Sequence, residues 1–125
     1  MSRLLLDTHV FLWWAKASPN IRAGWVEAIL DDSNSIHVSA VTAWEVETKK
    51  RIKKLDFNDD VGRVVAEFGF EALSVTLDHA SVAGSLDWDH RDPFDRMLVA
   101  QALSNDMVLL SADDAMKSAP GVRVL

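Results

Sequence analysis

The sequence predicts an α/β domain, built as a three-layer sandwich with a mainly parallel central sheet. Two observations lead to this fold class. Short apolar segments of strand length alternate along the chain with longer segments of helical spacing, and the first of them, Leu4–Leu6, is apolar at every position. Strands that are apolar on both faces are typical of parallel sheets covered by helices, and the intervening helices supply the crossovers that such sheets need.

The first half of the chain contains two expected strands. Asp7 closes the first strand, Pro19 interrupts the helical pattern that follows, and Asn58 is the expected N-cap of the last helix in this half. The expected elements are a strand at 4–6, helices at 8–15 and 22–30, a strand at 36–38, and helices at 41–54 and 59–68.

The second half continues the alternation. Pro93 fits the first position of a helix, and a charged loop precedes it. The expected elements are a strand at 73–75, a helix at 79–85, a loop at 87–92, a helix at 93–104, a strand at 107–110, a helical turn at 113–116 and a strand at 122–125. Because no repeat or linker interrupts this order, we expect one domain over residues 1–125.

Composition narrows the function classes. The chain has 125 residues, no cysteine and a net charge of −6. Thiolate metal sites and thiol nucleophiles are therefore excluded, and the absence of a long apolar stretch or a secretory signal predicts a soluble cytoplasmic protein. The net charge repels phosphate backbones, so a nucleic-acid ligand requires divalent cations or local basic residues such as those of the run 49–54, which otherwise form a solvated face.

Two aspartates follow expected strands. Asp7 comes directly after Leu6, and Asp113 follows Leu110 after two residues. Ligands of open α/β sheets gather at the carboxyl ends of the strands, and a carboxylate beside a buried strand requires a hydrogen bond, a counter-charge or a metal ion. For Asp7 the alternative interpretation as a helix N-cap stands beside this one.

Other acids occupy helix starts. Glu45 lies among apolar residues in the first turns of a helix, where it either pairs with Lys49 on a solvated face or serves a buried site. Asp92 and Asp95 flank Pro93, an arrangement that resembles a capping box, yet Asp95 also projects from the start of an apolar helix.

Three or four carboxylates at one rim need compensation. Two unit charges about 4 Å apart repel by about 4 kcal/mol at an effective dielectric constant near 20. Hard divalent cations such as Mg²⁺ or Mn²⁺ suit oxygen ligands, and a cation beside an anionic substrate indicates phosphodiester hydrolysis. The sequence therefore predicts an acidic metal site.

Four segments, in this order, resemble the successive motifs of PIN-domain ribonucleases, and more narrowly the VapC-type toxins of bacterial toxin–antitoxin pairs. The likeness covers essentially the full chain, and the four motifs are specific together although each is weak alone. The segments are 4–9 (LLLDTH), 39–46 (SAVTAWEV), 92–102 (DPFDRMLVAQA) and 109–113 (LLSAD).

The resemblance implies a metal-dependent endoribonuclease that is the toxin of a type II toxin–antitoxin system, with RNA as substrate. Asp7, Glu45, Asp95 and Asp113 would be the catalytic residues that bind Mg²⁺ or Mn²⁺. The resemblance also implies a homodimer and inhibition by a small antitoxin. Thr8 and Ser111 would orient carboxylates or water. Three further residues are candidates. Asp92 would be a helix cap or a ligand, Arg96 would contact a phosphate or neutralise the acids, and Asp114 would share the role of Asp113.

Two other functions remain open. A noncatalytic RNA-binding or protein-interaction module on the same fold would bind RNA independently of divalent cations. A phosphoryl-transfer domain would carry a phosphoryl group on Asp7, but it lacks the usual second acid near the first strand and the lysine after a late strand. His9 and His90 are candidate neighbours of the metal, but the favoured interpretation is that they are surface or core histidines.

Overall fold

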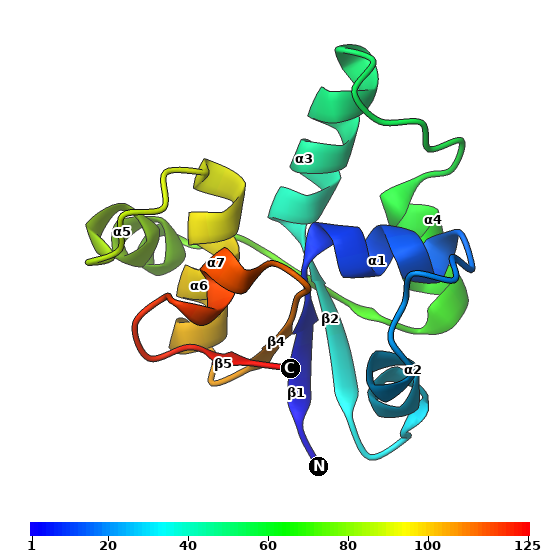
Figure 1. Ribbon diagram of the computed structural model, residues 1–125, viewed down its shortest axis with the longest axis horizontal. Coiled ribbons are helices and arrows are strands. Elements are labelled where there is room, and N and C mark those ends of the chain that lie inside the picture. Colours follow the sequence, from blue (N-terminus) through cyan, green and yellow to red (C-terminus); the bar gives the residue numbers. More distant parts are fainter.

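The computed structural model describes residues 1–125 and places helices on both faces of one sheet (Figure 1). Its elements are β1 (Arg3–Leu6), α1 (Thr8–Ala15), α2 (Ala23–Leu30), β2 (Ser35–Ser39), α3 (Ala40–Arg51), α4 (Val61–Phe68), β3 (Glu71–Leu73), α5 (Leu77–Ser85), α6 (Pro93–Ser104), β4 (Val108–Leu110), α7 (Asp114–Lys117) and β5 (Arg123–Val124).

The sheet has five strands in the order β3-β2-β1-β4-β5, and every neighbouring pair is parallel. The central strand β1 is enclosed on both sides: Leu5 is paired with His37 of β2 and with Leu109 of β4. The predicted α/β sandwich with a mainly parallel sheet is therefore confirmed.

Two hydrophobic cores fill the space between the sheet and its helices. Leu4 and Leu6 of β1 pack in one core with side chains of α1, α2 and α4, whereas Leu5 packs in the other with side chains of α6 and α7. Figure 1 shows the two helix groups on opposite sides of the sheet. This period-2 alternation explains why the strand is apolar at every buried position.

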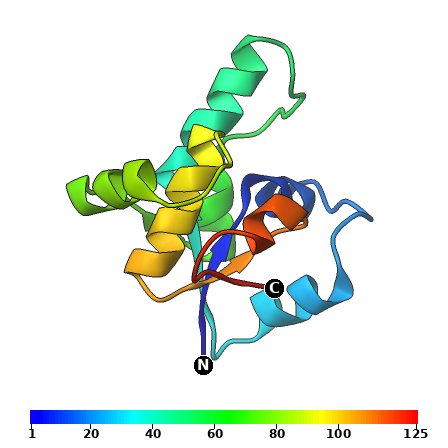
Figure 2. The same cartoon turned by 60° about the vertical axis from the view of Figure 1, so that its left-hand side comes forward.

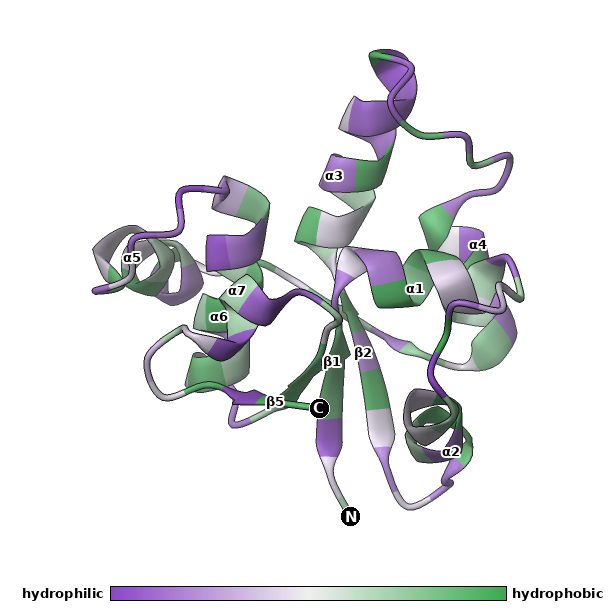
Figure 3. Ribbon diagram, viewed as in Figure 1, coloured by the Kyte–Doolittle hydropathy of each residue, from purple (hydrophilic) through white to green (hydrophobic).

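The carboxyl ends of the strands meet the start of several helices. α1 begins two residues after β1, and α3 begins directly after β2. In Figures 1 and 2 the far end of α3 extends beyond the rest of the molecule. Figure 3 shows hydrophilic residues at that end and in the loop before α6, whereas the strands are largely hydrophobic.

Most boundaries differ from the prediction by one or two residues, and three differences have a clear physical reason. α3 ends at Arg51 instead of residue 54, because Lys53 takes a left-handed backbone with φ of 60°. Asp60, not Asn58, caps α4 by accepting a hydrogen bond from the Arg63 N–H at 3.0 Å. β3 covers Glu71–Leu73 instead of 73–75, because its pairing with β2 ends where β2 gives way to α3.

None of the helices combines the length and the apolar character needed to cross a membrane.

Candidate metal centre

Asp7 is held at the end of β1 by two hydrogen bonds. Its Oδ1 accepts from the Thr8 backbone N–H at 2.7 Å, as an N-cap of α1, and its Oδ2 accepts from the Ser111 hydroxyl at 2.5 Å. Only 7% of the residue is exposed. Burial raises the pKa of Asp7 against the opposing effect of these bonds, and the negative charge of Glu45 raises it further. Asp7 is therefore a cap and also a carboxylate in need of a positive partner.

Glu45 projects from α3 toward the same place. Its Oε1 accepts from the Thr8 hydroxyl at 2.7 Å, and its Oε2 lies 2.5 Å from Lys49 Nζ. The residue is 4% exposed, so the Lys49 pair does not lie on a solvated face. Thr8 thus bridges the neighbourhoods of two acids: its backbone N–H serves Asp7 and its hydroxyl serves Glu45.

Asp92 and Asp95 have different roles: Asp92 caps a helix, and Asp95 faces the candidate centre. Asp92 Oδ1 accepts from the N–H groups of Phe94 and Asp95, so Asp92 is the N-cap of α6. The Asp95 carboxylate instead meets His90 Nε2 at 2.6 Å. Burial raises the pKa of Asp95 to about 6, and the charges of Asp92 and Asp7 add to the rise despite the bond from His90.

Asp113, the fourth predicted acid, lies between β4 and α7. Its Oδ1 caps α7 through the Ala115 N–H at 2.9 Å, and its own N–H donates to Ser111 Oγ at 3.1 Å. Ser111 therefore links Asp7 to Asp113. Atoms of His90, Asp95 and Asp113 that can bind a metal lie within 4.8 Å of one another.

Lys49 is the cation placed among these acids. Partial burial disfavours its ammonium group, yet the hydrogen bond and charge of Glu45, together with the charges of Asp92 and Asp95, raise the pKa of Lys49. One ammonium group faces several carboxylates. The centre therefore retains an excess of negative charge that a divalent cation would neutralise.

The remaining predicted residues lie elsewhere. Arg96 donates to the backbone carbonyl groups of Ala83, Leu86, Trp88 and His90 at 2.7–3.0 Å, so its guanidinium group ties the loop before α6 to the helix and is not presented to a phosphate. Asp114 has a 95% exposed side chain and pairs with Lys117 at 3.7 Å.

Sequence reasoning treated His90 only as a less favoured candidate neighbour of the metal, and it missed Thr42. His90 lies in an aperiodic loop, so no pattern indicates that it faces Asp95. Thr42 is fully buried, and its hydroxyl lies 3.2 Å from that of Thr8. Its position three residues before Glu45 on one helix was the available signal.

The donor set fits a hard divalent cation. Asp95 and Asp113 offer carboxylate oxygens in the group that includes His90, whereas Asp7 and Glu45 are not in this group and are connected to it through Ser111 and Thr8. The pKa values of Asp7 and Asp95 are raised, and an added positive charge would lower them. Ser111 and Thr8 fix two of the carboxylates through hydrogen bonds.

Comparison with solved structures supports the fold. Three chains similar in structure come from VapBC2 of Rickettsia felis bound to a promoter DNA fragment, DNA-bound VapBC of Salmonella typhimurium, and VapBC-5 of Mycobacterium tuberculosis. Their TM-scores are 0.72, 0.69 and 0.60, at 14%, 19% and 20% sequence identity. The alignments cover 98%, 100% and 100% of this chain and 97%, 98% and 97% of theirs.

A comparison with curated protein sequences finds no match. The sequence model of the PIN domain, however, matches residues 4–122, nearly the whole chain. The matched segment runs from β1 to the residue before β5 and includes all four predicted acids, so the chain belongs to the PIN domain family.

Proposed function

We propose that this chain is a divalent-cation-dependent endoribonuclease, acting as a single domain, and the toxin of a toxin–antitoxin pair. The observation that carries the nuclease is the set of contacts that connects four acids: Thr8 links Asp7 to Glu45, Ser111 links Asp7 to Asp113, and Asp113 lies with Asp95 and His90 in one group of potential metal ligands. Membership of the PIN domain family and the VapBC complexes among the similar structures support the assignment.

Asp7, Glu45, Asp95 and Asp113 would hold Mg²⁺ or Mn²⁺. A bound divalent cation lowers the pKa of water and shields the negative charge that develops during phosphodiester hydrolysis. Thr8 and Ser111 keep Glu45 and Asp7 in fixed orientations, so the carboxylates need little rearrangement to act together. Lys49 limits the repulsion among them before the substrate arrives.

The partners belong to the same proposal. The similar structures also include FitAcB of Neisseria gonorrhoeae, with a TM-score of 0.66, and a toxin–antitoxin complex of Klebsiella pneumoniae, with a TM-score of 0.63. We propose that a small antitoxin protein binds this chain and that the chain forms a homodimer. Co-purification with the protein encoded by the neighbouring reading frame tests the first point, and light scattering tests the second.

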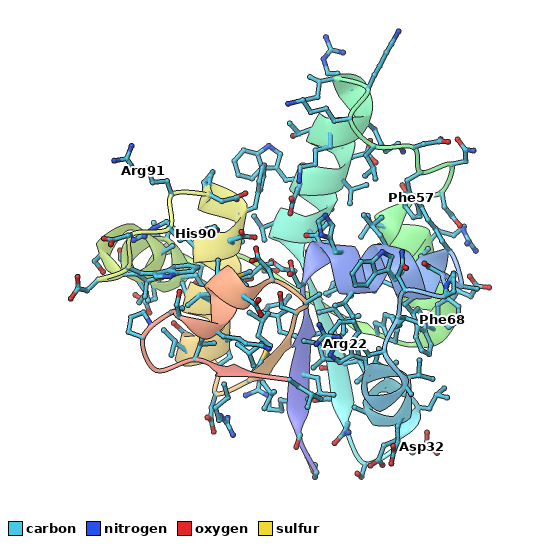
Figure 4. The ribbon with its side chains drawn as sticks, in the orientation of Figure 1. Arg22, Asp32, Phe57, Phe68, His90 and Arg91 are labelled. Carbon is cyan, nitrogen blue, oxygen red and sulfur yellow. The ribbon has the colours of Figure 1, made fainter.

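Cleavage of a broad RNA pool tests the activity. Wild-type protein is expected to cut RNA with Mg²⁺ or Mn²⁺ and to stop when a chelator is added, and Asp7→Asn is expected to lower the rate at least about a hundredfold. The matched control is Asp32→Asn, an exposed acid that Figure 4 places at the opposite end of the sheet, which is expected to cut like wild type. Asp114→Asn shows whether that residue takes part.

Mapping of the products completes the test. In-line attack by water leaves a 5′-phosphate and a 3′-hydroxyl group, whereas 2′,3′-cyclic phosphate ends would contradict the proposed route. RNA binding that resists the chelator, without cleavage, would favour a noncatalytic RNA-binding module instead.

A further inference from the structure

His90 is held in place by three different contacts. Its backbone carbonyl accepts from Arg96 at 3.0 Å, its ring lies against Trp88 with the ring centroids 4.7 Å apart, and its Nε2 meets the Asp95 carboxylate at 2.6 Å. Trp88 is fixed in turn by a hydrogen bond from its indole N–H to Ser118 at 3.1 Å. The imidazole is therefore preorganised at the acid centre.

The neighbouring Arg91 behaves differently. Figure 4 shows its side chain projecting away from the molecule, while His90 lies beside the start of α6. One loop thus presents an imidazole inward and a guanidinium group outward. The inward side chain is the one that a bound cation would meet.

The contacts that anchor the loop do not use the imidazole nitrogens. Arg96 holds backbone carbonyl groups, and Trp88 holds the face of the ring. Within the protein, the ring makes its one hydrogen bond through Nε2, to a carboxylate that also belongs to the candidate centre. The contact with Trp88 would be satisfied by another flat side chain, whereas Nε2 places a donor or metal ligand against Asp95.

The distances suit a shared cation. Ligands about 2.1 Å from one octahedral ion lie about 3 Å apart when adjacent and about 4 Å apart when opposite. His90 Nε2 and Asp95 Oδ2 are 2.6 Å apart, and the group formed with Asp113 spans no more than 4.8 Å. Small side-chain shifts bring all three atoms into that range.

We propose that His90 Nε2 binds the same cation as Asp95 and Asp113, and that this nitrogen makes the centre select Mn²⁺ over Mg²⁺. Mn²⁺ shares with Mg²⁺ a preference for carboxylate oxygen, but as a first-row transition metal it accepts an imidazole nitrogen more readily than Mg²⁺ does. Mg²⁺ binds oxygen ligands and retains its waters. The inference rests on the proposed function and refines it by naming the preferred ion.

Mn²⁺ binding to the purified protein tests the inference without reference to activity. Isothermal titration is expected to give wild type a higher affinity for Mn²⁺ than for Mg²⁺. His90→Gln keeps an N–H that can donate to Asp95 but replaces the nitrogen ligand with an amide, so it is expected to weaken Mn²⁺ binding about tenfold and to leave Mg²⁺ binding within about twofold. His9→Gln is the matched control: it removes an exposed histidine that lies outside the group, although its charge acts on Asp7, and it is expected to keep the preference of wild type for Mn²⁺ over Mg²⁺.

Electron spin-echo spectroscopy gives a direct signature. Mn²⁺ in the wild-type and His9→Gln proteins is expected to show hyperfine coupling to an imidazole nitrogen, and this coupling is expected to disappear in His90→Gln. Tight Mn²⁺ binding without nitrogen coupling would overturn the role of His90 and leave the proposed nuclease standing. Absence of any Mn²⁺ or Mg²⁺ binding by wild type would overturn both proposals.

Discussion

At the residue scale, each acid of the centre has a hydrogen-bond donor of its own. Ser111 serves Asp7, Thr8 serves Glu45, His90 serves Asp95 and the Ala115 N–H serves Asp113. These donors stabilise the charged carboxylates but do not remove the repulsion among them. Burial and the neighbouring negative charges together raise the pKa values of Asp7 and Asp95.

Asp95→Asn is expected to stabilise the protein when divalent cations are removed by a chelator. The pKa of Asp95 is raised from 3.8 to about 6, so between these values the folded protein binds more protons than the unfolded chain, and stability falls as pH rises. The variant is expected to gain about 1 to 2 kcal/mol at pH 7, after allowance for solvent screening, and almost nothing at pH 4. Chemical denaturation at the two pH values measures this difference.

Asp92→Ala is the control for that prediction. Asp92 supplies the N-cap of α6, so its loss is expected to destabilise the protein by about 1 kcal/mol at both pH values. If Asp95→Asn lowered the stability at pH 7 as much as Asp92→Ala does, Asp95 would have a capping role that the structure does not assign to it.

The candidate residues were partly predictable at this scale. Acids that follow parallel strands meet at one edge of the sheet, and this rule brings Asp7 and Asp113 together. The placement of Glu45 beside them came from the resemblance to PIN-domain ribonucleases, since Glu45 and Lys49 alone fit an ordinary ion pair. That pair exists, but its glutamate is buried while Lys49 is half-buried, and burial cannot be seen in the spacing of four residues.

At the element scale, Arg96 connects α6 to the loop that precedes it. Its guanidinium group donates to four backbone carbonyl groups, which are otherwise without the partners that a regular element would give them. The loop carries Trp88 and His90 to the centre. An arginine on the buried side of a helix thus shapes a segment that has no periodic structure of its own.

Arg96→Gln is expected to lower the free energy of unfolding by about 2 kcal/mol, because buried carbonyl groups lose a charged donor. Hydrogen exchange at residues 86–91 is expected to accelerate more than exchange within β1. Arg91→Gln changes an exposed arginine in the same loop and is expected to affect neither quantity. Equal effects of the two variants would show that the loop depends on overall charge instead of on the Arg96 contacts.

Elements with a strong pattern were predicted best. The helix expected over 93–104 is observed with the same bounds, since Pro93 and Asp92 mark its start clearly. β3 was displaced by two residues because its register follows hydrogen bonds to β2, which the sequence of β3 alone does not encode. The loop over 86–92 gave no signal for its conformation, because contacts with Arg96 determine it.

At the scale of the whole molecule, a net charge of −6 combines with an acid centre that contains one nearby lysine. The molecule is therefore expected to gain stability from an ion that binds the folded state alone. This gain differs from general screening by salt, which weakens repulsion between all exposed charges together.

Mn²⁺ at about a hundredfold above its dissociation constant is expected to add about 2.7 kcal/mol to the free energy of unfolding. Thermal unfolding with increasing Mn²⁺ measures the gain as a rising Tm, and a chelator is expected to reverse it. Sodium chloride at matched ionic strength is expected to produce a much smaller rise. A similar rise with both salts, or a full response in Asp7→Asn combined with Asp95→Asn, would contradict a specific centre.

The hydrogen bond between Ser111 and Asp7 joins residues 104 positions apart in the chain. During translation, β1 leaves the ribosome long before its neighbour β4 has been synthesised, and the hydroxyl group that orients Asp7 follows later still. The centre is therefore incomplete in a nascent chain until the segment that carries Ser111 has been synthesised and has packed beside β1.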